Sequence, residues 1–204
     1  MTDEPDPYAP KRERGHQRVA AIMEAGAALF KEQGYDAVTM TEIAARSGTA
    51  FGSLYRFFPS KEALADALLL RYAQHALDRL AALGENSATM SLDALTDAFI
   101  DFMLELQTER SFAIAVIDAR GGRDDKRSQF REALRGGIAA IVRKSCPRST
   151  KARSAAMAIG IMHILKGIAG VEGETTSIRR SLMAEYRLML RSYLASPTRP
   201  ATSD

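Results

Sequence analysis

Residues 39–61 read TMTEIAARSGTAFGSLYRFFPSK, and this stretch decides the fold. Thr39 and Glu42 have the spacing of a capping box, in which each side chain bonds a backbone N–H of the other residue at the start of a helix. Gly48 follows this first short helix, where a left-handed backbone ends a helix without a Cβ penalty. A second short helix comes directly after the glycine. Two short helices joined by a tight glycine turn predict a helix-turn-helix motif.

The second of these helices carries an unusual outer surface. It opens near Thr49 or Ala50 and Pro59 stops it, with Leu54 and Phe58 on its inner face. The remaining surface presents Phe51, Ser53, Tyr55, Arg56 and Phe57. An ordinary helical hairpin in a bundle is the alternative, but a solvated face does not normally carry three aromatic side chains in so short a space. The pattern therefore favours a recognition helix that enters the major groove of DNA.

A wider set of residues in one register resembles the N-terminal domain of TetR/AcrR-family transcriptional regulators. The set comprises Arg18, Ile22, Leu29, Phe30, Gly34, Tyr35, Thr39, Ile43, Ala44, Gly48, Gly52, Leu54, Tyr55, Phe58, Lys61, Glu62 and Leu64. The resemblance covers about a quarter of the chain. Three positions depart from the family pattern: Gly26 replaces a usual Ala, Thr49 a usual Val, and Ala50 a usual Ser or Thr cap. Thr49 is then the alternative cap, one residue early.

Contacts with double-stranded DNA follow from the motif and the resemblance. Tyr55 and Lys61 are expected to anchor phosphates with help from Thr41, because Lys61 begins the next helix, where the partial positive charge favours an anion. Base reading is expected from Phe51, Gly52, Ser53 and Arg56, with the thymine methyl as the target of Phe51 and either a guanine or a phosphate as the target of Arg56. Thr39 and Phe57 complete the predicted DNA-binding set.

Composition is that of an ordinary globular protein, with 46% hydrophobic and 26% charged residues and a net charge of +3. Residues 11–63 hold eight basic and six acidic side chains, or 8 − 6 = +2. Affinity for DNA must then come from the placement of a few charges, doubled in a dimer. We expect no membrane span, because the apolar run at residues 157–165 is much shorter than the about 20 residues required. The lack of a secretory signal and the single Cys146 predict a cytoplasmic protein.

The rest of the chain predicts an all-α fold of about nine helices, with no segment of alternating polarity. The expected helices after the motif cover residues 60–83, 91–106, 111–118, 128–144, 150–169 and 176–194, and the first helix covers residues 15–33. The predicted organisation is a disordered arm at 1–14, a three-helix helix-turn-helix domain at 15–63, a helical ligand-binding and dimerisation domain at 64–196, and a disordered tail at 197–204. The helix at 60–83 links the two domains.

The helix at 150–169 is apolar nearly all round, which predicts burial on every side and favours a partner chain over a monomeric core. The resemblance implies that the last two helices form a four-helix bundle with their copies in a homodimer. The expected interface residues are Ile161, Leu165, Ile168, Tyr186, Leu190 and Tyr193.

The resemblance also implies a small-molecule pocket in the regulatory domain, lined by apolar and adaptable methionine side chains and suited to a small hydrophobic effector. The predicted lining is Phe99, Phe102, Met103, Phe112, Met162 and His163. The alternative is that these residues are plain core.

An enzyme is not expected. His16, His75 and His163 lack the spacing of a metal site, and the chain has no GxSxG, Walker or Rossmann glycine pattern, so neither a metal nor a cofactor is predicted. The sequence favours a ligand-responsive repressor that binds a palindromic operator as a homodimer. The alternative is an effector-less DNA-binding or architectural protein controlled by a protein partner.

Overall fold

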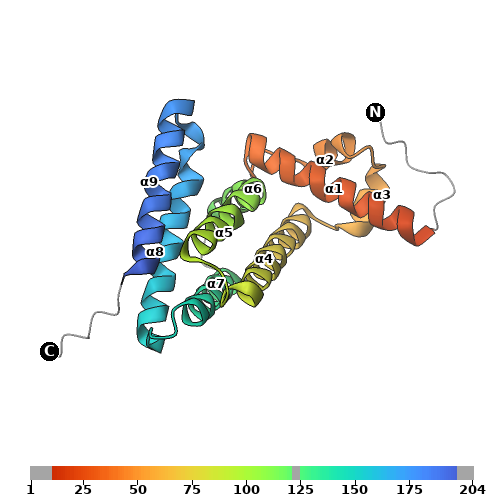
Figure 1. Ribbon diagram of the computed structural model, residues 1–204. Helices are drawn as coiled ribbons and strands as arrows, with labels where there is room; N and C mark the ends of the chain where they lie inside the picture. The colour runs from red at the N-terminus through yellow and green to blue at the C-terminus, as the bar shows by residue number, and fades with distance from the viewer. Residues whose placement is uncertain (1–10, 121–124, 197–204) are drawn as a thin grey trace. The chain divides into compact units, whose positions relative to one another are not determined.

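The computed structural model describes residues 11–120 and 125–196 (Figure 1). Within these ranges the chain forms α-helices, one short 3-10 helix and turns, which confirms the expected all-α class. The helices are α1 (Lys11–Gln33), α2 (Met40–Arg46), α3 (Phe51–Phe57), α4 (Lys61–Asn86), α5 (Leu92–Glu105), α6 (Gln107–Ala119), α7 (Asp125–Ser145), α8 (Lys151–Ala169), η1 (Gly170–Gly173) and α9 (Thr176–Ala195).

Helix boundaries differ from the expected ones most at the starts of α1 and α6, which begin at Lys11 and Gln107 rather than at residues 15 and 111. Residues 11–14 were expected in a disordered arm, and this is wrong, because they form the first turn of α1. Their Lys, Arg and Glu side chains are good helix formers, which explains the extension. The expected disordered segments at residues 1–10 and 197–204 lie outside the described residues.

The chain divides into two compact units, Met1–Tyr72 with Thr108–Gly122, and Ala73–Gln107 with Arg123–Asp204. The core of the first unit extends past the expected boundary at residue 63. It contains Leu64, Ala65 and Leu68 of α4, and α6 adds Phe112, Ala113 and Val116. The first unit is therefore larger than the three-helix domain that the sequence pattern outlined.

Glycines permit two turns and one close approach in the first unit. Gly34 ends α1 with φ +82°. Gly48 follows α2 with φ +60°, which confirms the left-handed position expected there. Gly26, which departs from the family pattern, lies against α4: a Cβ built there would be 2.8 Å from Cδ2 of Leu64. The missing methyl group thus allows α1 and α4 to pack closely.

Helix starts follow the expected caps, with one exception. The capping box at α2 is confirmed, with the Thr39 N–H donating to Glu42 Oε2 at 2.7 Å and the Glu42 N–H donating to Thr39 Oγ1 at 3.3 Å. Ser60 caps α4 through the N–H of Ala63 at 3.1 Å. The proposed capping of α3 by Thr49 is wrong: Ala50 occupies the cap position without a side-chain bond, and Thr49 is buried.

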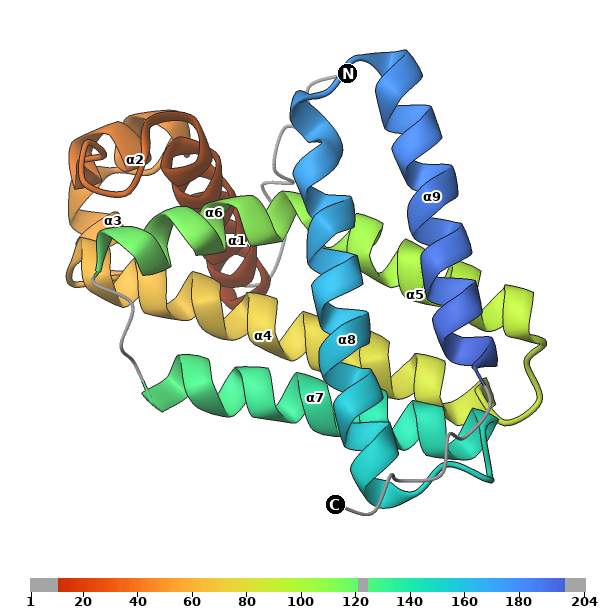
Figure 2. The same cartoon turned by 90° about the vertical axis from the view of Figure 1, so that its left-hand side faces the viewer.

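In the second unit, α8 packs against α5, α7 and α9, and α8 and α9 lie side by side as an antiparallel pair (Figure 2). Two tyrosines of α9 rest on glycines of α8. Cβ atoms built at Gly160 and Gly167 would lie 2.8 Å and 2.6 Å from the nearest atoms of Tyr193 and Tyr186. The seven-residue spacing on both helices gives two matched contacts, which bring the helices closer than larger residues would allow.

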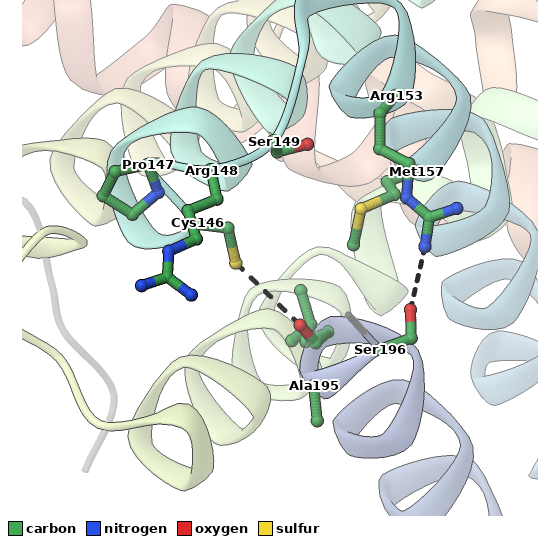
Figure 3. Close-up of a pocket in the computed structure, with 9 residues that line it drawn as sticks. Cys146, Pro147, Arg148, Ser149, Arg153, Met157, Ala195 and Ser196 are labelled. Carbon is green, nitrogen blue, oxygen red and sulfur yellow. Dashed lines mark hydrogen bonds between the residues drawn. The ribbon is translucent and has the colours of Figure 1, made fainter. Parts of the chain in front are cut away.

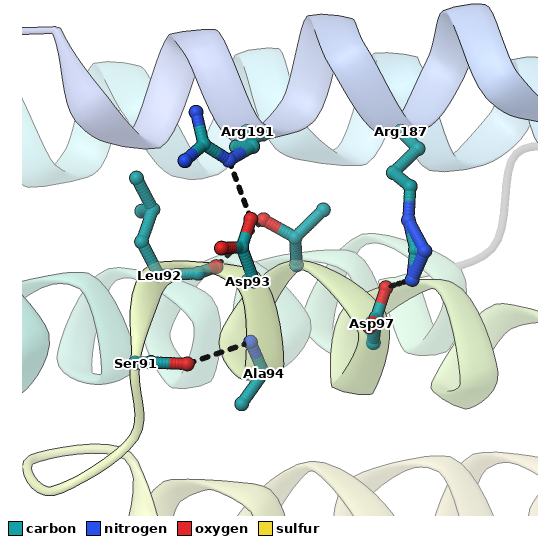
Figure 4. Close-up of polar contacts among 8 residues, drawn as sticks. Ser91, Leu92, Asp93, Ala94, Asp97, Arg187 and Arg191 are labelled. Atoms are coloured by element: carbon teal, nitrogen blue, oxygen red, sulfur yellow. Dashed lines mark hydrogen bonds and ion pairs between the residues drawn. The ribbon is translucent and has the colours of Figure 1, made fainter.

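Two ion pairs connect α9 to α5 (Figure 4): Arg191 bonds Asp93, and Arg187 bonds Asp97. All four side chains are 41–68% exposed. Exposed pairs add little to stability. Their regular four-residue spacing instead favours one register between the two helices.

No described helix combines the length and the apolar character that crossing a membrane requires.

The surroundings of two glycines predict opposite effects of an alanine substitution on the free energy of unfolding. Gly167→Ala should destabilise the protein by about 1–3 kcal/mol, because the new methyl group overlaps the Tyr186 ring. Gly136→Ala, in α7, should instead stabilise it by about 0.5–1 kcal/mol, because a Cβ there meets nothing within 4 Å and Ala is the better helix former. Urea unfolding of both variants measures the two effects. Equal shifts of the same sign would contradict the contact.

The capping box predicts a specific loss of stability in acid. Hydrogen bonds from the side chain and the backbone of Thr39 hold the pKa of Glu42 below its ordinary value. A carboxylate with a lowered folded-state pKa contributes stability above its unfolded pKa, and the contribution is lost as pH falls through the folded value. Between about pH 5 and pH 3, wild type should therefore lose stability more steeply than Glu42→Gln.

The measurement is the urea midpoint at several pH values, with Glu24→Gln, at an exposed position on α1, as the matched control. Parallel curves for wild type and Glu42→Gln would show that the box does not act in this way.

Candidate nucleic-acid interface

The helix α3 is held in the first unit by its two inward side chains. Leu54 is fully buried and Phe58, directly after the helix, is 7% exposed, as the sequence pattern predicted. The turn before α3 is closed by the Thr49 N–H, which donates to the Ala44 carbonyl at 3.0 Å. The left-handed Gly48 lets the chain reverse there. These contacts leave most of the remaining surface of α3 open to solvent.

An aromatic pair occupies that open surface. The side chains of Phe51 and Tyr55 are 50% and 40% exposed, and their ring centroids lie 4.7 Å apart. Gly52 is exposed beside them, and a Cβ built there would meet nothing within 4 Å. An exposed pair of large rings next to backbone without a side chain is typical of a surface that contacts another molecule closely.

The other predicted residues of α3 differ in their environment. Ser53 is half-buried, and Arg56 is exposed with its guanidinium carbon 5.3 Å from the centre of the Phe57 ring. Phe57 itself is half-buried and packs against the hydrophobic core of the first unit. Phe57 therefore supports the helix and the arginine above it, and its ring is less available than those of Phe51 and Tyr55.

Of the two threonines predicted at the start of α2, one already has an intramolecular role. The Thr39 hydroxyl accepts the Glu42 N–H and donates to Glu42 Oε2 at 2.7 Å. Thr41 is exposed in the first turn of α2. Thr41 is thus the threonine of this pair whose side chain remains open for an external contact.

Lys61 differs most from its expected role. Its Nζ donates to the carbonyls of Tyr35, Asp36 and Val38 at 2.9, 3.2 and 3.0 Å. An ammonium group has three N–H donors, so this set uses all of them. In this arrangement the charge is directed into the chain, so a phosphate contact through the side chain would require Lys61 to give up at least one of these bonds. Its backbone N–H at the start of α4 keeps the other part of the predicted role.

Tyr35 and Glu62 complete the surroundings of this ammonium group. The Tyr35 ring centre lies 4.5 Å from the Lys61 Nζ, and the Tyr35 hydroxyl donates to Glu62 Oε1 at 3.2 Å. Burial, together with the charge of Glu62, raises the pKa of Tyr35 to about 12. The phenol therefore stays protonated near neutral pH and remains a donor to the carboxylate.

A second cation of the helix-turn-helix region is also paired within the chain. Both terminal nitrogens of Arg46 bond the Glu32 carboxylate, at 2.5 and 2.7 Å, and this hydrogen bonding lowers the pKa of Glu32. Neither this pair nor the Lys61 contacts followed from the sequence, because the partners are 14 or more residues apart and match no motif. The basic residues counted in this region thus overstate the charge that is free to meet a phosphate.

The residues predicted to line an effector pocket do not share one environment. Phe99 and Phe102 are buried and Met103 and Met162 are half-buried. The other two differ: Phe112 lies in the hydrophobic core of the first unit, and the side chain of His163 is exposed on α8. The apolar spacing alone could not separate core positions of the two units.

Two hollows are present elsewhere in the second unit. One, of about 330 Å³, lies where the α7–α8 turn meets the end of α9 (Figure 3) and is lined by Cys146, Pro147, Arg148, Ser149, Arg153, Met157, Leu194, Ala195 and Ser196. Across it, Arg153 Nη2 donates to Ser196 Oγ at 2.9 Å. The other, of about 460 Å³, is lined by Asp97, Ile100, Asp101, Met183, Ala184 and Arg187. Neither includes any of the six predicted lining residues.

The predicted dimer interface also needs correction. Ile161, Ile168 and Leu190 have no exposed surface and Leu165 is 1% exposed, all within a single chain. Their assignment to a subunit interface is wrong, because a side chain already buried in its own chain has no surface to offer a second subunit. Tyr186 and Tyr193 are half-buried on the glycines of α8. The large apolar side chains that α8 and α9 do expose are Ile159, Ile178, Leu188 and Met189.

Among the described residues, no group of three or more His, Cys, Asp or Glu side chains is placed to hold a metal ion.

Comparison with known proteins places this site in a family. Residues 22–68 match the family model described as "Bacterial regulatory proteins, tetR family". Over 55 residues the chain is 44% identical to the HTH-type transcriptional repressor KstR of Rhodococcus jostii (strain RHA1), a match that covers 27% of this chain and 26% of KstR. The match thus spans about a quarter of that relative's length.

Solved structures share the fold over nearly the whole chain. Salmonella enterica GusR has a TM-score of 0.64 at 20% identity, covering 87% of this chain and 93% of GusR. The SmeT–triclosan complex has a TM-score of 0.60 at 18% identity, covering 92% of this chain and 98% of that chain. The family that these comparisons indicate consists of transcriptional regulators rather than enzymes. Residues 22–68, which hold the capping box, the glycine turn and the short exposed α3, match the tetR family of bacterial regulatory proteins.

Proposed function

We propose that this chain is a transcriptional repressor that places α3 in the major groove of operator DNA. The observation that carries the proposal is the exposed pair of Phe51 and Tyr55 on a helix that is otherwise anchored by Leu54 and Phe58. Exposed rings are unfavourable in water, and the thymine methyl gives Phe51 an apolar partner. The sequence similarity to a repressor, KstR, supports the direction of regulation.

Each exposed side chain has a role in this arrangement. The Tyr55 hydroxyl and Thr41 bond phosphates and fix the position of the protein on the duplex. Ser53 and Arg56 bond base edges, and the bare backbone at Gly52 permits close approach. The backbone N–H of Lys61 serves a phosphate at the start of α4.

The active form in this proposal is a homodimer on a palindromic operator. Helix-turn-helix readers commonly engage two half-sites about one DNA turn apart, and a twofold dimer supplies two recognition helices. The surface for the second subunit is the exposed apolar part of α8 and α9. Ile159 is 40% exposed, Ile178 48%, Leu188 57% and Met189 51%. Burying these side chains against their copies would remove apolar area from water.

Control by a small hydrophobic effector is the second part of the proposal, in a protein that acts in the cytoplasm. It is supported by the SmeT–triclosan complex, in which a protein of the same fold is bound to a small molecule. The competing function is an effector-less DNA-binding protein controlled by a protein partner. A thermal-shift screen with lipophilic molecules separates the two, because a ligand that binds only the folded state raises the melting temperature by mass action.

Replacement of Phe51 tests base reading. Phe51→Ala should relax the preference at one base pair in each half-site, where a mismatch in wild type costs about 1–3 kcal/mol. Selection of binding sites from a random pool gives the preference at every position. Leu70→Ala, at a 69% exposed position on α4, is the control and should leave the preferences unchanged. Identical site preferences for wild type and Phe51→Ala would remove Phe51 from the reading surface.

Charges on the exposed surface of α8 and α9 test the dimer. Ile159→Glu and Met189→Glu should give folded monomers, because both positions are exposed within the chain but would be buried between subunits. Leu70→Glu, which adds the same charge at an exposed position on α4, should leave the dimer intact. Light scattering gives the mass and circular dichroism the helical content. A dimer that persists in both α8 and α9 variants would rule out this surface.

A further inference from the structure

The start of α4 contains an unusual electrostatic arrangement. Lys61 is the first residue of a 26-residue helix, and Glu62 follows it. The amino end of a helix carries a partial positive charge, which favours the glutamate and disfavours the lysine. A cation at this position needs compensation from another source.

That compensation comes from the turn between α1 and α2. After the left-handed Gly34, the carbonyls of Tyr35, Asp36 and Val38 converge on the Lys61 Nζ within 3.2 Å. The face of the Tyr35 ring, 4.5 Å from Nζ, adds a favourable cation–π contact. The carbonyl oxygens of this turn thereby accept hydrogen bonds from a charged donor.

We propose that Lys61 is a positioning residue of the DNA-binding unit, which holds the α1–α2 turn against the start of α4 and makes no phosphate contact through its side chain. The inference rests on the proposed DNA-binding function, but its first part concerns the free protein. Val38 directly precedes Thr39, the cap of α2. Fixing the Val38 carbonyl therefore fixes where α2 begins, and α2 carries α3 through the Gly48 turn.

Anchoring a phosphate and holding the α1–α2 turn require different things of the Lys61 ammonium group. A phosphate contact needs a free donor, whereas all three donors of Lys61 are already used. Arginine satisfies a phosphate well, but its planar fork does not direct three bonds at carbonyls that converge on one point. Replacement by arginine consequently separates the roles: it preserves a phosphate contact and breaks the carbonyl contacts.

Three variants test the proposal in the free protein. Lys61→Met and Lys61→Arg should each lower the melting temperature by about 4 °C or more. Lys31→Met, at an exposed lysine of α1, is the matched control and should not change it. Nitrogen-15 NMR of lysine ammonium groups supplies a signature that stability alone does not: wild type should show an ammonium signal that is protected from solvent exchange and is absent in Lys61→Arg. Absence of that signal in wild type, or full stability of Lys61→Arg, would overturn the proposal.

Operator binding across a range of salt concentrations completes the test. For Lys61→Met the dissociation constant should rise by the same factor at every salt concentration, and the protected signal of wild type should not move when operator is added. Loss of a phosphate contact would instead reduce the salt slope by about 0.9 per half-site. A reduced slope overturns the proposal. If wild type binds no DNA, the proposed function fails, while the stability and NMR results still decide whether the carbonyl contacts exist.

Discussion

The burial of Leu54 and Phe58 in the core of the first unit is the contact on which the candidate interface depends. The helix α3 has seven residues, and isolated helices shorter than about 12–15 residues are marginal in water. It also lacks a side-chain cap, because alanine stands at its cap position. Its stability and orientation must therefore come from tertiary packing, and exposed aromatic residues are tolerable on it only because the inner pair is so well buried.

Polar contacts around α2 and α4 supply the rest of the positioning. The capping box fixes the start of α2, and Arg46 at its end bonds Glu32 of α1. The capping box is internal to the start of α2, whereas the Arg46–Glu32 pair ties its end to α1. The exposed side chains of α3 can then differ in sequence without loss of the fold, so the fold leaves the contact surface free to set specificity.

Local signals in the sequence were sufficient for the helix-turn-helix framework. Capping-box spacing, the left-handed Gly48 and the inward residues of α3 each depend on neighbours within a few positions, and the structure confirms them. The cap of α3 was misassigned, because the Thr49 side chain is buried beneath the turn and its hydroxyl donates to the Ser47 carbonyl at 3.4 Å.

Contacts between residues far apart in the chain could not be predicted from the sequence in the same way. A lysine at a helix start matches a phosphate anchor, and only the folded turn shows three carbonyls around its ammonium group. Apolar residues at helical spacing mark a buried face without identifying what covers it. Phe112 therefore seemed suited to a pocket although it lies in the first unit's core, and Ile161 seemed suited to an interface although its own chain buries it.

Because two cations near α3 are bonded within the chain, this chain would hold DNA through few phosphate contacts. With Arg46 paired to Glu32 and Lys61 directed at carbonyls, few positive charges near α3 remain for phosphates. Affinity for DNA rises with the number of phosphates neutralised, so one half-site alone would bind weakly. Two linked half-sites gain affinity only while their spacing matches that of the grooves. A repressor built in this way would be sensitive to the distance between its recognition helices, and a small change in the dimer would be enough to release the operator.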